Sequence, residues 1–306
     1  MLIGYHASHE QFPPSRLLTL AKAAEDAGFG GIMTSDHITP WSERQANSGN
    51  NWAWLGAALA ATSLPFSSLA IPGGWRYHPV VLAHTIATLA EIYPDRLRWI
   101  AVGSGEALNE AVVGNGWPDK TQRNERLLAG TEIIRALLRG DTVSVRHPWF
   151  AAEDAKLWSR PARSPLFFGA ALTSATAAWM GPWADGLITG KPRVLQLQVA
   201  WATNKEEARI AAWQNWRNAA APPDCLAELK LPRDFDAVTR GMAPEEIEDV
   251  IPLIVHGEEL LALIGAAGSC GFEEIYIHNV SLDQEGFLWF MAREVIPYLT
   301  SDAQNK

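Results

Sequence analysis

The sequence predicts a (β/α)8 barrel that forms a single domain over residues 1–306. Short apolar runs alternate with segments of helical periodicity along most of the chain, which is typical of parallel strands joined by helices. Eight candidate strands can be assigned, the number that closes such a barrel. The alternative is a doubly wound open sheet, but the turn from His6 to Glu10 lacks the GxGxxG glycines of a dinucleotide-binding sheet.

The first strand-helix unit sets the pattern for the others. Residues 2–6 form an apolar run, and residues 14–27 then carry leucine and alanine at helical spacing before Gly28. Later, Pro79 suits a first helical turn, and Asp119 with Gln122 resembles a capping box. The expected strands are 2–6, 31–34, 66–71, 98–102, 166–170, 185–189, 195–202 and 272–278. The expected helices are 14–27, 52–62, 80–91, a long one after Asp119, 174–180, 205–218 and 285–299.

Two stretches depart from this pattern. Only a few residues separate strands 185–189 and 195–202, whereas a parallel crossover needs about a dozen residues or more. Either a crossover helix is missing there or one strand assignment is wrong. Residues 220–251 contain Pro222, Pro223, Pro232 and Pro244. They are expected to form an irregular excursion at the barrel mouth, of a length usually found in lids or disordered segments.

The composition limits which classes of partner and which cellular compartment are expected. Acidic residues outnumber basic ones by 34 to 25, and the net charge of -9 opposes binding to nucleic acid. No apolar run approaches the roughly 18 residues of a membrane span. The two cysteines lack CxxC spacing and no signal-peptide pattern follows Met1, which favours the cytoplasm. The expected partner is a small-molecule substrate; a homo-oligomer is compatible with the sequence, and a dimer is the favoured form.

Polar side chains follow four consecutive candidate strands. Barrel enzymes carry their chemistry at the carboxyl ends of the strands, so these side chains are expected to line one cleft. Glu10 follows the first strand, and Trp75 follows the third. The second strand is followed by Asp36, His37 and Trp41, and the fourth by Gly103, Ser104, Gly105, Glu106 and Asn109.

Each of these residues has a chemical and a structural interpretation. His37 suits a general base, or it caps the following loop. Asp36 could orient the imidazole, although adjacent residues of a strand point to opposite faces and a contact needs an irregular turn. Glu106 is either a helix cap or a proton donor. Trp41 and Trp75 offer flat walls for a planar ring or pack beneath the rim.

The sequence also bears on an anion-binding turn and on metal sites. Gly103 to Gly105 lets backbone N–H groups approach a phosphate or a ring carbonyl, or simply makes the bend after a strand. The eight histidines form no HExxH or Cys/His ligand spacing, so no metal site is expected. Ser104 lacks the GxSxG pattern of a serine nucleophile.

At these motifs the chain resembles the luciferase-like flavin oxidoreductases, and among them the F420-dependent glucose-6-phosphate dehydrogenases. The segments that carry the resemblance are Gly4-Tyr-His-Ala-Ser-His-Glu-Gln-Phe12, Ser35-Asp-His-Ile-Thr-Pro-Trp41, Arg76-Tyr-His-Pro79 and Gly103-Ser-Gly-Glu-Ala-Leu-Asn-Glu110. The resemblance implies a luciferase-like barrel and a flavoprotein oxidoreductase that moves hydride to or from a small organic substrate. The cofactor it implies is FMN or coenzyme F420.

The resemblance also implies roles for individual residues. His37 would take the substrate hydroxyl proton, Glu106 would supply a proton near the reduced ring, and Trp41 would pack against the developing charge. The implied cofactor-binding residues are Asp36, His37, Trp41, Gly103, Ser104, Gly105, Glu106, Asn109, Gly169, Ala170 and Ala171. Glu10 and Trp75 would lie on the substrate side.

Two departures from the family pattern bear on substrate and cofactor. Pro252 stands before Leu253-Ile-Val and Lys191 falls at the short junction, so no lysine for a sugar phosphate can be placed and glucose 6-phosphate is not expected. Gly169-Ala-Ala replaces an expected Gly-Gly pair, which leaves less room for the tail of F420. A related subgroup is thought to have returned to FMN, and both cofactors stay open.

Three other functions compete with this interpretation. An FMN monooxygenase, in which reduced flavin reacts with oxygen, is the main alternative. A non-catalytic flavin-binding protein would keep the ring walls and could dispense with His37 and Glu106. A barrel glycosidase with Glu10 and Glu106 as its paired carboxylates would leave the Asp36, His37 and Trp41 set unexplained.

Overall fold

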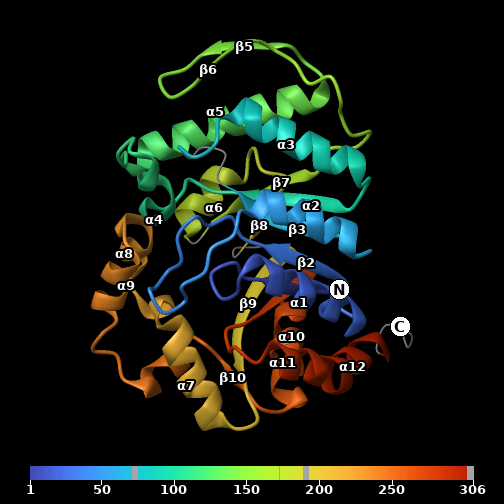
Figure 1. The fold of residues 1–306 in the computed structure, drawn as a ribbon, viewed down its shortest axis with the longest axis vertical. Coiled ribbons are helices and arrows are strands. Elements are labelled where there is room, and N and C mark those ends of the chain that lie inside the picture. Colours follow the sequence, from blue (N-terminus) through green and yellow to red (C-terminus); the bar gives the residue numbers. More distant parts are fainter. Residues whose placement is uncertain (71–74, 172, 189–192, 302–306) are drawn as a thin grey trace. The chain divides into compact units, whose positions relative to one another are not determined.

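A computed structural model of the chain describes residues 1–70, 75–171, 173–188 and 193–301 (Figure 1). The chain divides into two compact units. Unit 1 comprises residues 1–64, 191–226 and 231–306, and unit 2 comprises residues 65–190 and 227–230. All eight predicted strands are present in the predicted order. The assignment of residues 1–306 to a single domain stays a prediction.

Unit 1 contains a five-stranded parallel sheet in the order β10-β9-β11-β1-β2. Its strands are β1 (Leu2–Ala7), β2 (Gly31–Thr34), β9 (Arg193–Trp201), β10 (Leu253–Ile254) and β11 (Glu274–Asn279). Ala7 of β1 pairs with Thr34 of β2. The segments that follow these two strands therefore leave the sheet at the same edge, and both carry predicted site residues.

The helices of unit 1 begin with the signals that the sequence suggests. Pro14 occupies the first turn of α1, and the side chains of Asn50 and Asn204 cap α2 and α7. The helices are α1 (Pro14–Asp26), α2 (Asn51–Ala61), α7 (Lys205–Trp216), α9 (Pro232–Val238), α10 (Gly257–Ser269), α11 (Gln284–Phe290) and α12 (Ile296–Ser301). The 3-10 segments η2 (Arg217–Ala220) and η3 (Pro244–Asp249) and the π-helical segment η4 (Met291–Val295) complete the unit.

The excursion expected over 220–251 is present, but it is more regular than the sequence suggested. Three short helical segments occupy it: α8 (Pro223–Glu228), which crosses the division between the units, then α9 and η3. Each of the three begins at a proline. Proline has no N–H and a fixed φ, and both suit a first helical turn, so these residues start helices where they were expected to break the chain.

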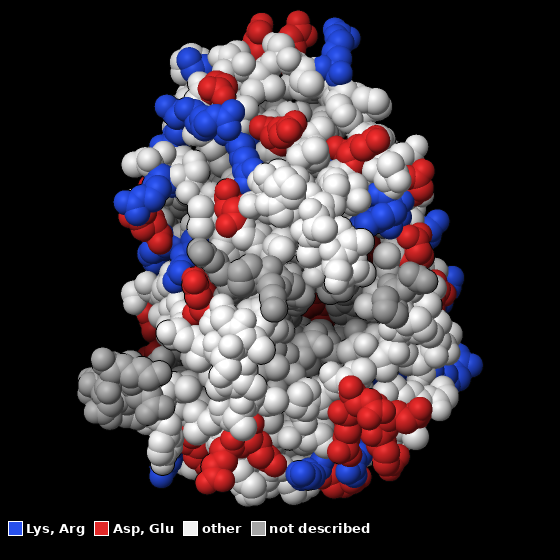
Figure 2. All heavy atoms as spheres, turned by 180° about the vertical axis from the view of Figure 1, so that it is seen from behind, with Lys and Arg blue, Asp and Glu red and all other residues white. Residues whose placement is uncertain are grey.

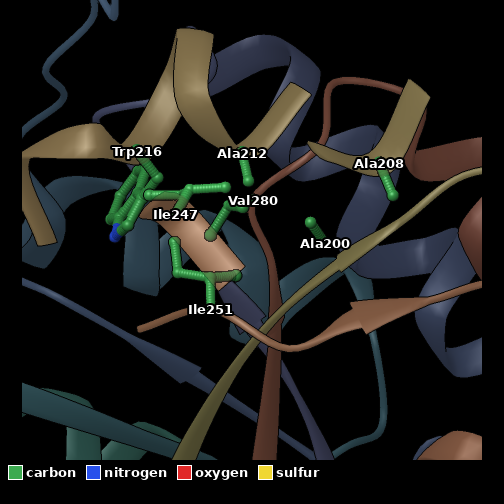
Figure 3. Packing of buried hydrophobic residues seen from close by; sticks show 7 residues of the cluster. All are labelled: Ala200, Ala208, Ala212, Trp216, Ile247, Ile251 and Val280. Atoms are coloured by element: carbon green, nitrogen blue, oxygen red, sulfur yellow. The ribbon is translucent and has the colours of Figure 1, made fainter. Parts of the chain in front are cut away.

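An apolar cluster attaches this excursion to the sheet of unit 1 (Figure 3). Ile247 and Ile251, at η3 and just after it, pack with Ala212 and Trp216 of α7. The other members are Ala200, Ala208 and Val280, and the partly buried Trp41 packs against the cluster. The excursion thereby supports a predicted site residue.

Unit 2 contains a four-stranded parallel sheet in the order β3-β4-β7-β8. Its strands are β3 (Phe66–Ala70), β4 (Leu97–Val102), β7 (Leu166–Ala170) and β8 (Gly186–Ile188). Its helical segments are α3 (Pro79–Ile92), α4 (Ala107–Glu110), η1 (Ala111–Val113), α5 (Lys120–Arg139) and α6 (Ser174–Met180). Helices α3 and α5 pack side by side (Figure 1). The Asp119 side chain accepts a hydrogen bond from the Gln122 backbone N–H at 2.9 Å, as an N-cap does.

The sequence left the short junction open, and strand β10, helix α10 and a hairpin in unit 2 were not predicted. Both β8 and β9 exist, so neither strand assignment at the short junction was wrong; residues 189–192 and the candidate phosphate ligand Lys191 lie outside the described residues. The antiparallel hairpin of β5 (Val143–Arg146) and β6 (Ala151–Ala155) was not predicted. Its strands are short and mostly exposed, so they lack an apolar run.

Figure 2 shows both acidic and basic side chains on this face, with several acidic side chains gathered near its lower edge and no continuous basic surface. Within the described part of the chain, no helix combines the length and apolar character that a bilayer crossing requires.

Gly257, at the start of α10, lies close to the backbone of Glu294, and this contact gives a test of the packing in unit 1. A Cβ added to Gly257 would lie 2.5 Å from the backbone oxygen of Glu294. Gly257→Ala should therefore lower the free energy of unfolding by about 1–3 kcal/mol, measured by urea denaturation. Gly265, on the same helix, has no atom within 4 Å of its added Cβ. Gly265→Ala should be neutral or stabilising by up to about 1 kcal/mol; equal losses in both variants would contradict the packing argument.

Candidate active site

A buried carboxylate, that of Glu10, lies at the carboxyl edge of β1 and β2. Glu10 is 2% exposed, and the Ser8 hydroxyl donates to its Oε2 at 2.6 Å. The Ser35 hydroxyl donates to Oε1 at 3.1 Å, and His37 Nδ1 lies 3.3 Å from the same oxygen. The segments after two neighbouring strands thus supply one carboxylate with three partners.

These contacts fix the ionisation of Glu10 and orient His37. Burial acts to raise the pKa of Glu10, but His37 and the Ser8 hydrogen bond outweigh it and lower that pKa to about 2. An ionised carboxylate only accepts hydrogen bonds, so Nδ1 of His37 carries the proton that points at Glu10. In the uncharged form of the ring the lone pair then resides on Nε2, and the side chain is 13% exposed. This arrangement has the geometry that a general base requires, with an anion at the opposite ring nitrogen.

Asp36, expected as the residue that orients His37, is buried at 4% exposure beyond the end of β2. The carboxylate at 3.3 Å from His37 Nδ1 is that of Glu10. Sequence reasoning placed Glu10 on the substrate side because it considered only chain neighbours of His37. The parallel register of β1 and β2, which sets Ala7 beside Thr34, brings Glu10 to the imidazole.

Trp41 is held between the imidazole and the excursion. Its ring centroid lies 5.1 Å from that of His37 and 5.3 Å from that of Phe235 in α9, with an edge-to-face geometry for the latter. The same loop is tied to α7, because Arg44 Nε donates to the Gln214 backbone oxygen at 2.8 Å and Gln45 Nε2 to that of Asn215 at 3.0 Å. Trp41 is therefore a supported wall of the site in unit 1.

Three further buried histidines of unit 1, His6, His9 and His278, were not singled out from the sequence. His278 Nε2 lies 2.8 Å from Gln11 Oε1, and the His6 and His278 ring centroids are 4.4 Å apart. Burial lowers the pKa of His278 to about 3, and burial together with His278 lowers the pKa of His6 well below its usual value. Burial also lowers the pKa of His9. With their pKa values lowered, these imidazoles are uncharged near neutral pH.

The predicted glycine turn in unit 2 follows β4. Gly105 has a φ of +85°, a conformation that favours glycine, and Ser104 is 8% exposed. Lys120 Nζ donates to the Ser104 hydroxyl at 2.6 Å, and burial lowers the pKa of Lys120. The turn therefore presents a backbone bend with a cation beside it, which suits an anionic group.

Glu106 stands at the N-cap position of α4 but makes no side-chain cap bond. Its Oε2 accepts a hydrogen bond from Asn109 Nδ2 at 3.1 Å, and Asn109 is 2% exposed. The amide thus orients the carboxyl group, as a positioned proton donor requires. The placement of Glu106 in the same cleft as His37 stays a prediction.

At the end of β7, the three predicted tail-binding residues have a packing constraint of their own. A Cβ at Gly169 would lie 2.5 Å from Met180 Sδ of α6, so the glycine is required for packing within unit 2. Ala170 is partly buried, and Ala171, 1% exposed, donates its N–H to the Ile188 backbone oxygen at 3.4 Å. A role of this segment in cofactor binding stays a prediction.

Trp75, predicted on the substrate side, contacts a group of buried charges in unit 2. Its Nε1 donates to the Gly116 backbone oxygen at 3.2 Å, and the Arg126 guanidinium lies 4.0 Å from the ring centroid. Nearby, Arg76 Nε donates to Glu110 Oε1 at 2.8 Å in an almost fully buried ion pair. Sequence reasoning did not single out Arg126. Among the described residues, no group of three His, Cys, Asp or Glu side chains could hold a metal ion.

Comparison with known proteins identifies relatives over nearly the whole chain. The family described as "Luciferase-like monooxygenase" matches residues 2–212. A protein named F420-dependent glucose-6-phosphate dehydrogenase from Kribbella flavida is 31% identical over 333 aligned positions, covering 97% of this chain and 98% of that protein. Its namesake from Beutenbergia cavernae is 30% identical, covering 97% of each chain.

Solved structures show the same architecture. A structure of an F420-dependent secondary alcohol dehydrogenase in complex with an F420-acetone adduct superposes with a TM-score of 0.88 at 26% identity, covering 97% of this chain and 98% of that one. The coenzyme F420-dependent tetrahydromethanopterin reductase from Methanopyrus kandleri has a TM-score of 0.75 at 17% identity, covering 97% of this chain and 99% of that one. The predicted (β/α)8 barrel fold is confirmed by this likeness.

The buried histidines predict how stability depends on pH. Because the folded-state pKa of His278 is about 3 and its ordinary value is 6.5, the unfolded chain binds more protons below pH 6.5. The free energy of unfolding should fall as the pH drops from about 6.5 to 5, by up to ~1.4 kcal/mol per pH unit for each such histidine. His278→Gln should flatten this slope in urea titrations, whereas His84→Gln, at an exposed position of α3, should not. An unchanged slope in His278→Gln would refute the assignment.

Proposed function

Because the chain belongs to the luciferase-like monooxygenase family, we propose that it oxidises a small neutral alcohol, with His37 as the base and Glu10 as its buried counter-charge. The chain is an oxidoreductase of the luciferase-like class that depends on a flavin or deazaflavin. The proposal adds the direction of the chemistry, the substrate class and the roles of the residues. One observation carries it: the contact at 3.3 Å between His37 Nδ1 and Glu10 Oε1.

A proton leaves the substrate hydroxyl when an alcohol carbon loses a hydride. In the proposed mechanism His37 Nε2 takes that proton, and the ring becomes an imidazolium. The ionised Glu10 at Nδ1 stabilises this positive charge, and the Ser8 and Ser35 hydroxyls keep the carboxylate fixed. Trp41, 5.1 Å from the imidazole, excludes water from one side of it. The product is the corresponding ketone or aldehyde.

The described residues fit a planar cofactor that carries phosphate. In unit 1, Trp41 and His37 present ring faces to a planar system, with Asp36 buried beside them. In unit 2, Gly103, Ser104 and Gly105 form the bend beside Lys120, and Asn109 orients Glu106 for proton donation. When bound, the flavin or deazaflavin supplies the hydride-accepting chemistry.

We propose coenzyme F420 as this cofactor and dehydrogenation as the reaction. The relatives that span the whole chain are named as F420-dependent dehydrogenases. A base with a permanent counter-charge serves alcohol oxidation directly, because the hydroxyl proton must be removed. The monooxygenase alternative has no comparable observation in its favour.

The substrate proposed is an uncharged secondary alcohol. No lysine or arginine of unit 1 is among the buried residues that the structure describes. The polar groups near Glu10 are instead the neutral His6, His9 and His278. Neutral donors and acceptors suit hydroxyl and carbonyl groups, whereas a buried dianion without basic partners carries a large desolvation penalty.

The role of His37 can be separated from cofactor packing. His37→Ala should leave cofactor affinity nearly unchanged and reduce the single-turnover rate of cofactor reduction by ~10²–10⁴ at saturating substrate, the usual range for one positioned acid-base group. Trp41→Phe, which keeps a ring against Phe235, serves as the control with a much smaller effect. A variant that lost cofactor affinity but kept its rate at saturation would remove His37 from the chemistry.

Substrate class can be tested by comparing matched compounds. Reduction of bound F420 should proceed with small secondary alcohols such as 2-propanol and should be slow with glucose 6-phosphate. The reason is the absence of buried basic groups among the described residues of unit 1. The measurement is kcat/KM for each compound. Saturable turnover of glucose 6-phosphate at higher kcat/KM than the alcohols would contradict the proposal.

A further inference from the structure

We propose that Arg126 binds a phosphate group of the cofactor in a buried site beside Trp75. The inference rests on the proposed function for the identity of the ligand, and on the contacts within unit 2 for its position. It assigns an anion-binding role to a residue outside the motifs that mark the active site.

Arg126 is a fully buried cation without a hydrogen-bond partner. The residue is 0% exposed, and none of its three guanidinium nitrogens bonds to any atom in the described part of the chain. The guanidinium lies over the face of Trp75, 4.0 Å from the ring centroid. Stacking compensates only part of the lost hydration, because the N–H groups at the edge of the guanidinium still need acceptors.

The surrounding charges leave an excess of one positive charge. Glu110, with a fully buried side chain, is engaged by Arg76, whose Nε and backbone N–H donate to its two oxygens at 2.8 and 3.2 Å. Arg123 donates to Glu228 Oε1 at 3.0 Å and to the Pro118 backbone oxygen. Each of these cations has an acceptor, and Arg126 is left without one. An unpaired buried charge is strongly unfavourable, so the site is complete only with an anion.

The chemistry of the site favours a phosphate. A guanidinium presents a planar fork of N–H donors that matches the oxygens of phosphate and carboxylate. A phosphate ester offers several acceptor oxygens to the three guanidinium nitrogens, whereas a carboxylate offers only two.

Trp75 connects Arg126 to accessible space. The indole that stacks on the guanidinium also lines a surface pocket of about 360 Å3, together with Tyr77, Asn115 and Trp149. The site therefore borders solvent at one side chain. The low polarity around Arg126 is also reflected in its pKa, which burial lowers to about 10.

The first experiment uses inorganic phosphate and requires no cofactor. We expect phosphate to raise the Tm of the cofactor-free full chain saturably, relative to chloride at equal ionic strength. Arg126→Met should abolish this rise and should show an equal or higher Tm without phosphate, because an unpaired buried charge is replaced by an apolar side chain. Arg139→Met, on the same helix at an exposed position, should behave like the wild type.

The second experiment measures binding of cofactor pairs that differ in their phosphate. By titration calorimetry, Arg126→Met should reduce the preference for FMN over riboflavin, and for F420 over its phosphate-free deazaflavin core, by about 10- to 100-fold. Affinity for the phosphate-free partner should stay within about 3-fold of wild type. Arg126→Lys keeps the charge but loses the planar set of guanidinium donors, so its preference for the phosphorylated compound should lie between those of the wild type and Arg126→Met. If Arg126→Met does not fold, Arg126→Lys provides the test.

The outcomes distinguish this inference from the proposed function. If the phosphate preference persists in Arg126→Met, or persists fully in Arg126→Lys when only that variant folds, Arg126 is not the ligand. Equal loss of phosphate stabilisation in Arg126→Met and Arg139→Met would reveal general screening and would also overturn it. If the preference collapses and no alcohol is oxidised, the anion site stands and the proposed reaction fails.

Discussion

The ionised carboxylate of Glu10 is the interaction on which the site in unit 1 depends. A buried carboxylate remains charged only if donors replace its water, and here Ser8, Ser35 and His37 do so. These donors come from the segments after β1 and β2, so their geometry requires the parallel pairing of the two strands. The tautomer of His37, and with it the basic character of Nε2, follows from the same carboxylate. Trp41 and the loop around it are then fixed against His37 by α7 and α9.

The buried charges of the two units differ in sign: the central charge is a carboxylate in unit 1, whereas guanidinium groups predominate in unit 2. In unit 1, hydroxyl groups donate to the Glu10 carboxylate, and burial lowers the pKa values of the His6 and His278 imidazoles. Unit 2 buries three guanidinium groups, those of Arg76, Arg123 and Arg126, and the carboxylate of Glu110 pairs with Arg76. A neutral hydroxyl substrate suits the first environment and an anionic group suits the second.

Local signals explain what the sequence could predict, and long-range contacts explain what it could not. Apolar runs and caps such as Asp119 lie within a few residues of the elements they define, so all eight strands and the start of α5 were found. The prolines of 220–251 were misjudged, because a proline that ends one segment can equally begin a helix. Glu10 reaches His37 only through strand register. Arg126 did leave a signal: with Gly130, Ile133 and Leu137 it falls on a buried stripe of α5, where a charged residue is out of pattern.

In both units, burying ionisable groups away from water lowers the stability of the folded protein. Neutral buried histidines must release their protons to fold, so acid favours the unfolded chain, and an unpaired guanidinium loses its hydration without gaining an acceptor. A ligand that binds only the folded state recovers stability in proportion to the logarithm of its concentration over Kd. Replacing Arg126 by an apolar residue should then raise the stability measured without an anion and remove the extra stability gained on binding one. A purely structural residue would not change these two quantities in opposite directions.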